Sequence, residues 1–108
     1  MRHELLGPYE VAIPQTRRER ARGLLGHDIL EPGEGLLLER CRSVHTFGMR
    51  FPIDAVLLDR RWQVIAVVQL APRRLLIPRP RVRHVLEVAP GTALRPGLRL
   101  TRRVAAPA

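Results

Sequence analysis

Prolines and glycines divide this sequence into short apolar segments, and their spacing restricts the fold more than any other feature. The 108 residues include ten prolines and eight glycines. Residues 71–81, APRRLLIPRPR, hold three prolines and four arginines, and proline is excluded from helix interiors and central strands because it lacks a backbone donor. Short strands separated by such turns predict a mainly β fold, a compact sandwich or barrel-like sheet.

The apolar runs between these turns are the predicted strands. Residues 55–58 and 62–70 flank a turn at Asp59–Arg60 and therefore predict a hairpin. Prolines bound residues 8–14, which indicates an edge strand because edge strands tolerate a missing donor. The other predicted strands are residues 35–38, 44–48 and 82–88 and a last short strand after the turn at Pro96–Gly97.

One N-terminal α-helix interrupts the strands, at about residues 17–25. Thr16 and Glu19 have the spacing of a capping box, in which each side chain accepts a bond from the backbone N–H of the other. Gly26 would supply the left-handed residue that ends such a helix. The sequence therefore predicts a single helix before the main run of strands.

Length and composition indicate one small soluble domain. We predict an N-terminal lead-in at residues 1–7, the β domain at residues 8–103 and a C-terminal tail at residues 104–108. No apolar run approaches the roughly 18 residues of a membrane span, and the first residues lack the apolar core of a signal peptide. Cys41 is the only cysteine, so the default location is cytoplasmic.

The formal charge of +9 comes entirely from arginine, since all nineteen basic residues are Arg. Residues 61–103 hold ten of them against Glu87 alone. A basic loop of this kind contacts phosphates in nucleic-acid binders, yet Trp62 is the only aromatic residue in this half that bases could stack on. A solvated arginine face is the simpler interpretation. The candidate phosphate contacts are Arg73, Arg74, Arg79, Arg81 and Arg83.

Polar residues that can do chemistry are concentrated in residues 44–54, VHTFGMRFPID. Asp54 precedes an apolar strand, and a buried carboxylate must accept hydrogen bonds or meet a cation. It either locks a neighbouring loop to the sheet or orients a ligand in a pocket. His45 and Thr46 would point to opposite faces of their strand. We predict a candidate pocket formed by Asp54, His45, Thr46 and Glu87.

Glu87 is the lone acid of the basic half and lies in the middle of a predicted strand. We expect it to pair with an arginine across the sheet. Should it face Asp54 instead, the two carboxylates would share a site and the pKa of one of them would rise.

Metal and nucleophile patterns are weak in this sequence. Cys41 and His45 are four residues apart and His84 lies far along the chain, but paired zinc ligands such as C-x-x-C are missing. A nucleophile arrangement of Cys41, His45 and Asp54 uses suitable residue types. Such a triple occurs by chance in most chains of this size. We therefore predict no metal and no cofactor.

Four motifs in order resemble the DUF192 family. They are T-x-x-E-R-x-x-G-L-L, then G-L-L-L, then VHTFGMRFPIDAVLLD, then VLEVAPGTA followed by Gly97, and together they cover about residues 8–103. Many members carry FWMKNT-x-x-P-L-D in the third motif. Aligned on Pro52 and Asp54, its tryptophan falls on His45 and its threonine on Met49, which indicates a variant branch. The resemblance implies a compact mainly β domain with one helix and no established reaction.

These observations favour a binding or accessory module with a small-ligand or partner site near residues 44–54. The first alternative is a small hydrolase that uses Asp54 and His45. The second is nucleic-acid binding through the basic loop from Arg73 to Arg83. Whether the chain is an enzyme stays open, with a non-enzymatic role favoured. A hydrolase would need His45 and Asp54 in one solvent-reachable cleft, whereas a nucleic-acid binder would need the arginines on one face.

Overall fold

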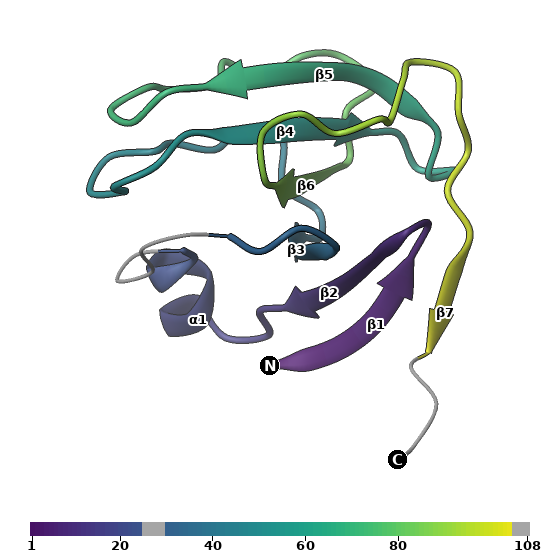
Figure 1. Cartoon of the computed structure of the whole chain (residues 1–108), viewed down its shortest axis with the longest axis horizontal. Helices are drawn as coiled ribbons and strands as arrows, with labels where there is room; N and C mark the ends of the chain where they lie inside the picture. The colour runs from purple at the N-terminus through teal and green to yellow at the C-terminus, as the bar shows by residue number, and fades with distance from the viewer. Residues whose placement is uncertain (25–29, 105–108) are drawn as a thin grey trace.

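Seven β-strands and one short α-helix make up the described part of the chain, residues 1–24 and 30–104 of a computed structural model. Figure 1 shows the strands in two layers, with the helix at one end of the lower layer. The mainly β fold with one N-terminal helix is therefore confirmed. The elements are β1 (Arg2–Leu6), β2 (Tyr9–Ile13), α1 (Arg17–Arg22), β3 (Glu34–Leu38), β4 (Ile53–Leu58), β5 (Val64–Leu70), β6 (His84–Val88) and β7 (Arg102–Val104).

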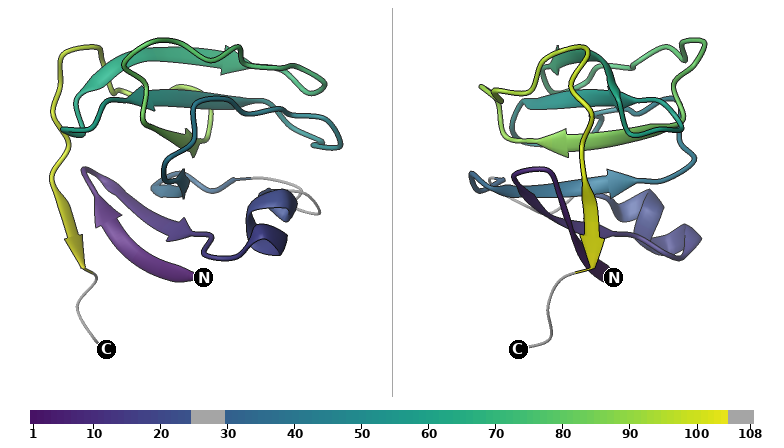
Figure 2. Two further views of the ribbon diagram at one scale, coloured as in Figure 1. Left: turned by 180° about the vertical axis from the view of Figure 1, so that it is seen from behind. Right: turned by 90° about the vertical axis from the view of Figure 1, so that its right-hand side faces the viewer.

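All seven strands belong to one sheet with the order β5-β4-β6-β3-β2-β1-β7. Strands β2 and β3 pair in parallel, while the other neighbours are antiparallel. The sheet curls over so that β4, β5 and β6 lie above β1, β2 and β3, and β7 runs down one side (Figures 1 and 2). Among the described residues, no helix is long and apolar enough to cross a membrane.

The strands at the centre of the sheet are buried on both faces. Along β4, Ile53, Ala55 and Leu57 belong to one apolar cluster, whereas Val56 and Leu58 belong to another. This alternation follows from the two-residue period of a strand. The sheet therefore separates two cores, and a polar residue on a central strand must be buried in one or the other.

The predicted hairpin is confirmed as β4 and β5, which pair from Ile53 with Leu70 to Leu58 with Val64. Asp59 shapes the turn, because its Oδ1 accepts hydrogen bonds from the backbone N–H groups of Arg61 at 2.8 Å and Gln63 at 3.0 Å. A carboxylate that binds backbone donors two and four residues ahead replaces the missing ladder bonds of a tight turn.

The helix begins as predicted and ends earlier. Thr16 Oγ accepts from the N–H of Glu19 at 3.1 Å, and Glu19 Oε1 accepts from the N–H of Thr16 at 3.2 Å, so the capping box is present. Helix α1 stops at Arg22, since Gly23 takes a φ of 48° that glycine adopts readily. The predicted end at Leu25 and Gly26 lies outside the described residues.

Two strand predictions were wrong, and both errors come from pairing partners that a local pattern does not show. Residues 44–48 form no strand, and within them only His45 makes a bridge, to Leu75. Strand β2 is not at an edge, because β1 pairs with it on one side and β3 on the other. Strand β1 lies within the lead-in of residues 1–7, where we predicted no strand.

Gly35 on β3 lies tightly against the side chains of β6, and we predict that Gly35→Ala destabilises the protein. A Cβ at this position would lie 2.9 Å from Leu86 Cδ1 and 3.2 Å from Val88 Cγ1. Overpacking of this kind costs about 1–2 kcal/mol, which urea unfolding would measure. In a Leu86→Val background the cost should shrink, because the closest atom is removed. An unchanged unfolding midpoint for Gly35→Ala alone would contradict the prediction.

Candidate functional site

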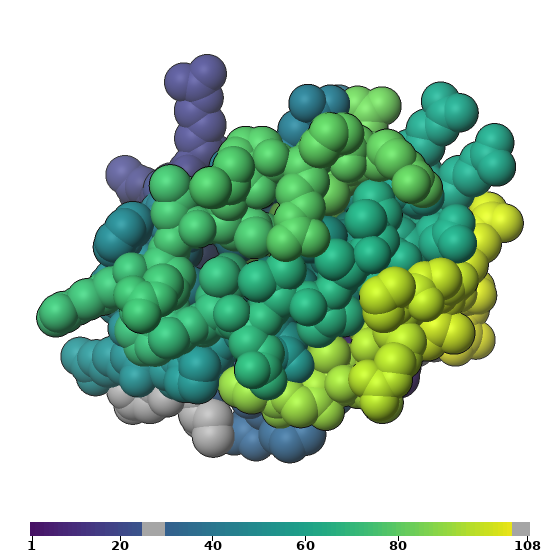
Figure 3. Space-filling view, turned by 90° about the horizontal axis from the view of Figure 1, so that it is seen from above, coloured from purple at the N-terminus to yellow at the C-terminus, as the bar shows by residue number. Residues whose placement is uncertain are grey.

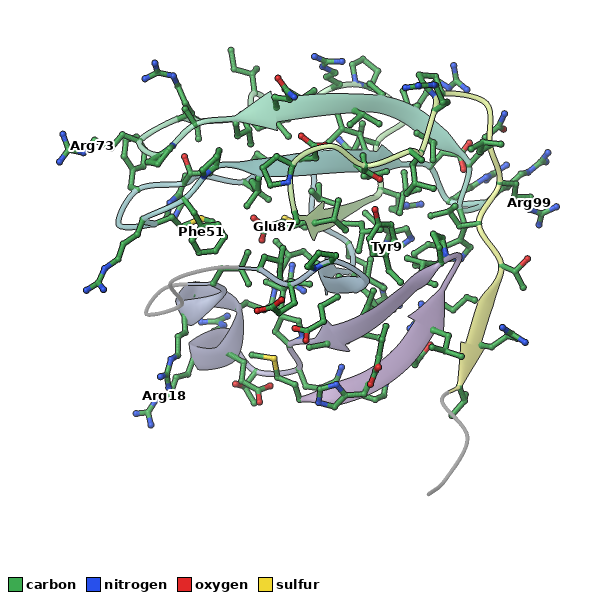
Figure 4. The ribbon with its side chains drawn as sticks, in the orientation of Figure 1. Tyr9, Arg18, Phe51, Arg73, Glu87 and Arg99 are labelled. Atoms are coloured by element: carbon green, nitrogen blue, oxygen red, sulfur yellow. The ribbon has the colours of Figure 1, made fainter. Side chains whose placement is uncertain are left out.

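Glu87 is a carboxylic acid buried in the sheet, with no partner among the residues that the structure describes. It lies on β6 between β3 and β4, where its neighbours in register are Leu36 and Ala55. Its exposed fraction is 4%, and Figure 4 shows its side chain between the upper and lower layers. No hydrogen bond or ion pair to it occurs among the described residues. Burial raises its pKa to about 7.

The predicted pairing of Glu87 with an arginine across the sheet is therefore wrong. The register places two apolar residues opposite it, Leu36 and Ala55. An unpaired carboxyl group in such surroundings is costly when ionised. Glu87 is the strongest candidate for a functional group because no structural bond explains its burial.

Glu87 lines a cavity of about 130 Å³. The walls come from helix α1 and the two residues after it, from the end of β3, and from the segment that follows β3. Leu24, Leu38 and Met49 make part of this lining apolar. The polar side chains in the lining, besides Glu87, include Arg20, Cys41, Ser43 and His45.

Cys41 is not an activated nucleophile. Its Sγ donates to the carbonyl oxygen of Ser43 at 2.9 Å. Burial raises the pKa of the thiol, whereas reactive cysteines have lowered pKa values. The cavity thus brings Cys41 and His45 together with Glu87, but the thiol stays protonated at neutral pH.

His45 lies at the exposed side of this cavity. Its ring packs against the ring of Phe47, with centroids 5.5 Å apart, and its backbone forms the bridge with Leu75. The side chain is exposed. His45 can therefore meet a ligand that enters the cavity, whereas Glu87 meets it inside.

Thr46 is a structural clamp and has no exposed surface. Its hydroxyl donates to the carbonyl oxygen of Ala71 at 2.6 Å and accepts from the N–H of Arg74 at 2.8 Å. Its own N–H donates to the carbonyl oxygen of Arg74 at 2.9 Å. These bonds hold the proline-rich segment against residues 44–46.

Asp54 holds a loop on the other face of the sheet. Its Oδ2 accepts from the backbone N–H groups of Gly91 at 2.9 Å and Thr92 at 3.0 Å. The loop is also held from the lower layer, since Tyr9 and Thr92 share a hydrogen bond of 2.6 Å. Asp54 is 3% exposed, and its Oδ1 has no partner among the described residues. This is the geometry of the loop-locking interpretation.

The four residues of the predicted pocket are thus divided. His45 and Glu87 line one cavity, while Thr46 is enclosed and Asp54 lines a separate hollow with Thr92. Asp54 pairs with Val88 in register, one residue beyond Glu87, so the two carboxylates point to opposite faces. Asp54 and Glu87 do not share a site, and neither do Asp54 and His45.

Sequence reasoning missed Arg20, Leu24 and Leu38 as walls of the Glu87 cavity. Arg20 is a charged residue of the predicted helix, which is typical of a solvent-exposed position, and the two leucines look like ordinary core residues. The only available signal was Glu87 itself, an acid in the middle of an apolar strand.

Among the residues that the structure describes, no three His, Cys, Asp or Glu side chains gather as metal ligands would. His84 packs flat on the Trp62 ring, with centroids 4.1 Å apart. Its Nδ1 accepts from the N–H of Arg40 at 3.0 Å, and burial lowers its pKa. The Arg102 guanidinium lies over the Trp62 ring, 4.9 Å from its centroid. His84 and Arg102 therefore both pack on the ring on which a base would have to stack.

The candidate phosphate contacts do not form one group. Arg73 and Arg74 follow the end of β5, beside Thr46, and Figure 4 shows Arg73 at the tip of the molecule. Arg83 lies at the opposite end of the hairpin, since its N–H bonds the carbonyl oxygen of Leu58 at 2.7 Å. Strand β5, seven residues long, separates the two ends by roughly 20 Å.

Comparisons with known proteins identify the family from sequence and the fold from solved structures. A UPF0127 protein of Pyrococcus horikoshii is 40% identical over 45 residues, which are 42% of this chain and 39% of that protein. The chain thus matches about two fifths of the length of that relative.

Two crystal structures share the fold. A Novosphingobium aromaticivorans protein of unknown function is 18% identical, with a TM-score of 0.78 over 92% of this chain and 83% of that one. A Sinorhizobium meliloti protein, described as a candidate transcription regulator, is 23% identical, with a TM-score of 0.76 over 87% and 81%. At these identities the likeness shows the fold alone. The DUF192 family model, described as uncharacterized ACR, matches residues 2–106, and the chain therefore belongs to this family.

Proposed function

We propose that this protein is a binding module and that its ligand site is the cavity lined by Glu87. The observation that carries the proposal is a buried carboxyl group that faces a cavity and has no hydrogen-bond partner within residues 1–24 and 30–104. Such a group lowers the stability of the fold when it ionises. A ligand that supplies the missing hydrogen-bond donor would remove that cost.

The cavity suits a small molecule with an apolar body and one donor group. A volume of about 130 Å³ is close to the roughly 150 Å³ that accommodates benzene in an engineered protein cavity. Leu38 and Met49 would contact the apolar body, and Glu87 would accept the donor. An amine is the strongest such donor, because its bond to a carboxylate is charge-assisted.

A hydrolase that uses Asp54 and His45 is not what the geometry supports. These two residues line different cavities, and Asp54 Oδ2 is already engaged by a loop. A cytoplasmic location is part of the proposal, since the described chain has a free cysteine, Cys41, and thiols persist in reducing compartments.

NMR titration with butylamine, beside butanol as the uncharged match, tests the site. We expect a dissociation constant in the millimolar range for a ligand of five heavy atoms. The NMR signals of Leu38 and Met49 should change their chemical shifts as the ligand binds. The butylamine affinity should rise about tenfold between pH 6 and pH 8, as Glu87 ionises around a pKa of about 7. The butanol affinity should stay nearly constant, because the alcohol carries no charge.

Glu87→Gln provides the control, since glutamine keeps the size of the side chain and cannot ionise. The variant should lose the preference for butylamine over butanol and the dependence on pH. Equal butylamine affinities for the wild type and Glu87→Gln at pH 8 would contradict the proposal.

A further inference from the structure

Five arginines line a further hollow, at the turn of the β4–β5 hairpin, which we call the arginine hollow. Its volume is about 350 Å³, within the range of small-molecule sites. In the view of Figure 3, chain segments near residues 60 and 80 lie side by side on the upper face. The five arginines are Arg42, Arg60, Arg61, Arg81 and Arg83.

Backbone hydrogen bonds bring the three segments of this hollow together. The N–H of Arg83 donates to the carbonyl oxygen of Leu58 at 2.7 Å, and the N–H of Cys41 donates to the carbonyl oxygen of Arg83 at 2.9 Å. Residues 42, 60–61 and 81–83 are therefore fixed side by side by the sheet. The hollow is a feature of the fold, although its arginines are distant in sequence.

The positive charge of the hollow is compensated only in part, since the Asp59 carboxylate attracts Arg81 and Arg61 and leaves an excess of arginines. Asp59 is the one acid in its lining, and Asp59 Oδ1 is occupied by the backbone of the turn. Among the described residues, none of the five guanidinium groups forms a salt bridge or a side-chain hydrogen bond. Five like charges in one concave surface repel one another and attract anions.

The backbone at Arg81 is strained, as it also is at Arg40, Trp62 and Arg73 outside the hollow. The φ of Arg81, 72°, lies in the left-handed region, where glycine is preferred and an L side chain is strained. Arginine at this position supplies a guanidinium to the hollow at a cost to the fold.

We infer that this hollow binds a polyphosphate group of a small molecule. Guanidinium groups form paired, charge-assisted bonds with phosphate oxygens, and several of them match an anion with several charges. None of the residues lining the hollow is aromatic, and the Trp62 ring nearby is packed on His84. The site therefore recognises phosphates and provides no stacking for bases. This inference concerns a different cavity from that of Glu87 and does not depend on it.

Calorimetric titration with inorganic pyrophosphate tests the inference, and the chain offers a matched pair of variants. Arg81 and Arg73 are both exposed and both have positive φ, 72° and 63°, but only Arg81 lines the hollow. Arg81→Gln should weaken pyrophosphate binding about tenfold, the value of one lost charge-assisted bond. Arg73→Gln removes the same charge and should weaken it less than about twofold.

Arg81→Gly separates binding from folding. Glycine accepts the left-handed backbone, so the melting temperature should stay equal or rise while pyrophosphate binding falls about tenfold. Wild-type binding should also weaken as salt rises from 50 mM to 500 mM, as expected for a charged site. Absent binding at 50 mM salt, or equal losses for Arg81→Gln and Arg73→Gln, would overturn the inference. The inference would also be overturned if a single-stranded oligonucleotide displaced bound pyrophosphate at a concentration a hundredfold below that of the pyrophosphate, because the site would then prefer nucleic acid.

Discussion

Replacing Glu87 with glutamine should stabilise the protein by about 3 kcal/mol at pH 8 and change its stability little near pH 4. The pKa of Glu87 is raised by burial from 4.5 to about 7, and each unit corresponds to about 1.4 kcal/mol. The gain should appear as a higher melting temperature, by roughly 10–20 °C for a domain of this size.

The sign follows from the two pKa values. Below pH 4.5 the carboxyl group is protonated in both the folded and the unfolded chain, so ionisation costs nothing. Between pH 4.5 and about 7 the unfolded chain loses its proton while the folded chain keeps it. The folded state therefore becomes less stable as the pH rises through this interval, and the loss is complete above it.

Urea unfolding of wild type and Glu87→Gln at pH 4, 6 and 8 measures this effect. Glu34→Gln is the matched control, because Glu34 is exposed at the start of β3. The free energy of unfolding of Glu34→Gln should equal that of the wild type at all three pH values. A Glu87→Gln protein that is less stable than wild type at pH 8 would show that the carboxylate has a stabilising partner.

Replacing Asp54 with alanine should destabilise the protein by about 3 kcal/mol. The change leaves the N–H groups of Gly91 and Thr92 without their acceptor, and a hydrogen bond to a charged group is worth about 1.5–3 kcal/mol. The lost desolvation cost of the buried carboxylate reduces the sum. Two such bonds still amount to a large part of the 5–15 kcal/mol that stabilises a typical domain.

Asp54→Asn distinguishes the bonds from the charge. Asparagine keeps an oxygen that accepts from both N–H groups, so this variant should lose less stability than Asp54→Ala in the same urea experiment. Its butylamine titration should match that of the wild type, because Asp54 does not line the Glu87 cavity. Loss of butylamine binding in Asp54→Asn would show that the two faces of the sheet are coupled.

One short segment borders both proposed sites. Cys41 lines the Glu87 cavity and Arg42 lines the arginine hollow. The two sites differ in chemistry: the first is small and partly apolar, and the second is wider and basic. Variants of one site should leave ligand binding at the other unchanged, which the two titrations together would test.

Local patterns predicted the elements whose formation needs no distant partner. The capping box at Thr16 and Glu19 and the β4–β5 hairpin are confirmed, because each depends on residues close in the chain. The strand predicted at residues 44–48 is wrong because the proline-rich segment that faces it pairs at Leu75 alone. Proline at positions 72, 78 and 80 removes donors that a longer ladder would need.

For the candidate site too, local patterns identified unusual residues, whereas their grouping depended on distant contacts. The sequence identified Asp54 and Glu87 as unusual, since each is an acid beside apolar strand residues. It also offered the loop-locking role of Asp54 as one of two interpretations, and the geometry agrees with that role. Only the register places Asp54 and Glu87 on opposite faces, because a shift of one residue reverses the face of every side chain.

By itself, the sequence determined that this chain forms a mainly β domain with one capped helix, and its motifs indicated the DUF192 family. These properties depend on local turns, caps and apolar periodicity. The tertiary structure alone decided which polar residues meet. Glu87 faces a cavity and meets no partner in the described part of the chain, and arginines from three segments surround one hollow. The physical reason is that burial and charge clustering depend on contacts between residues far apart in the chain, which no local pattern encodes.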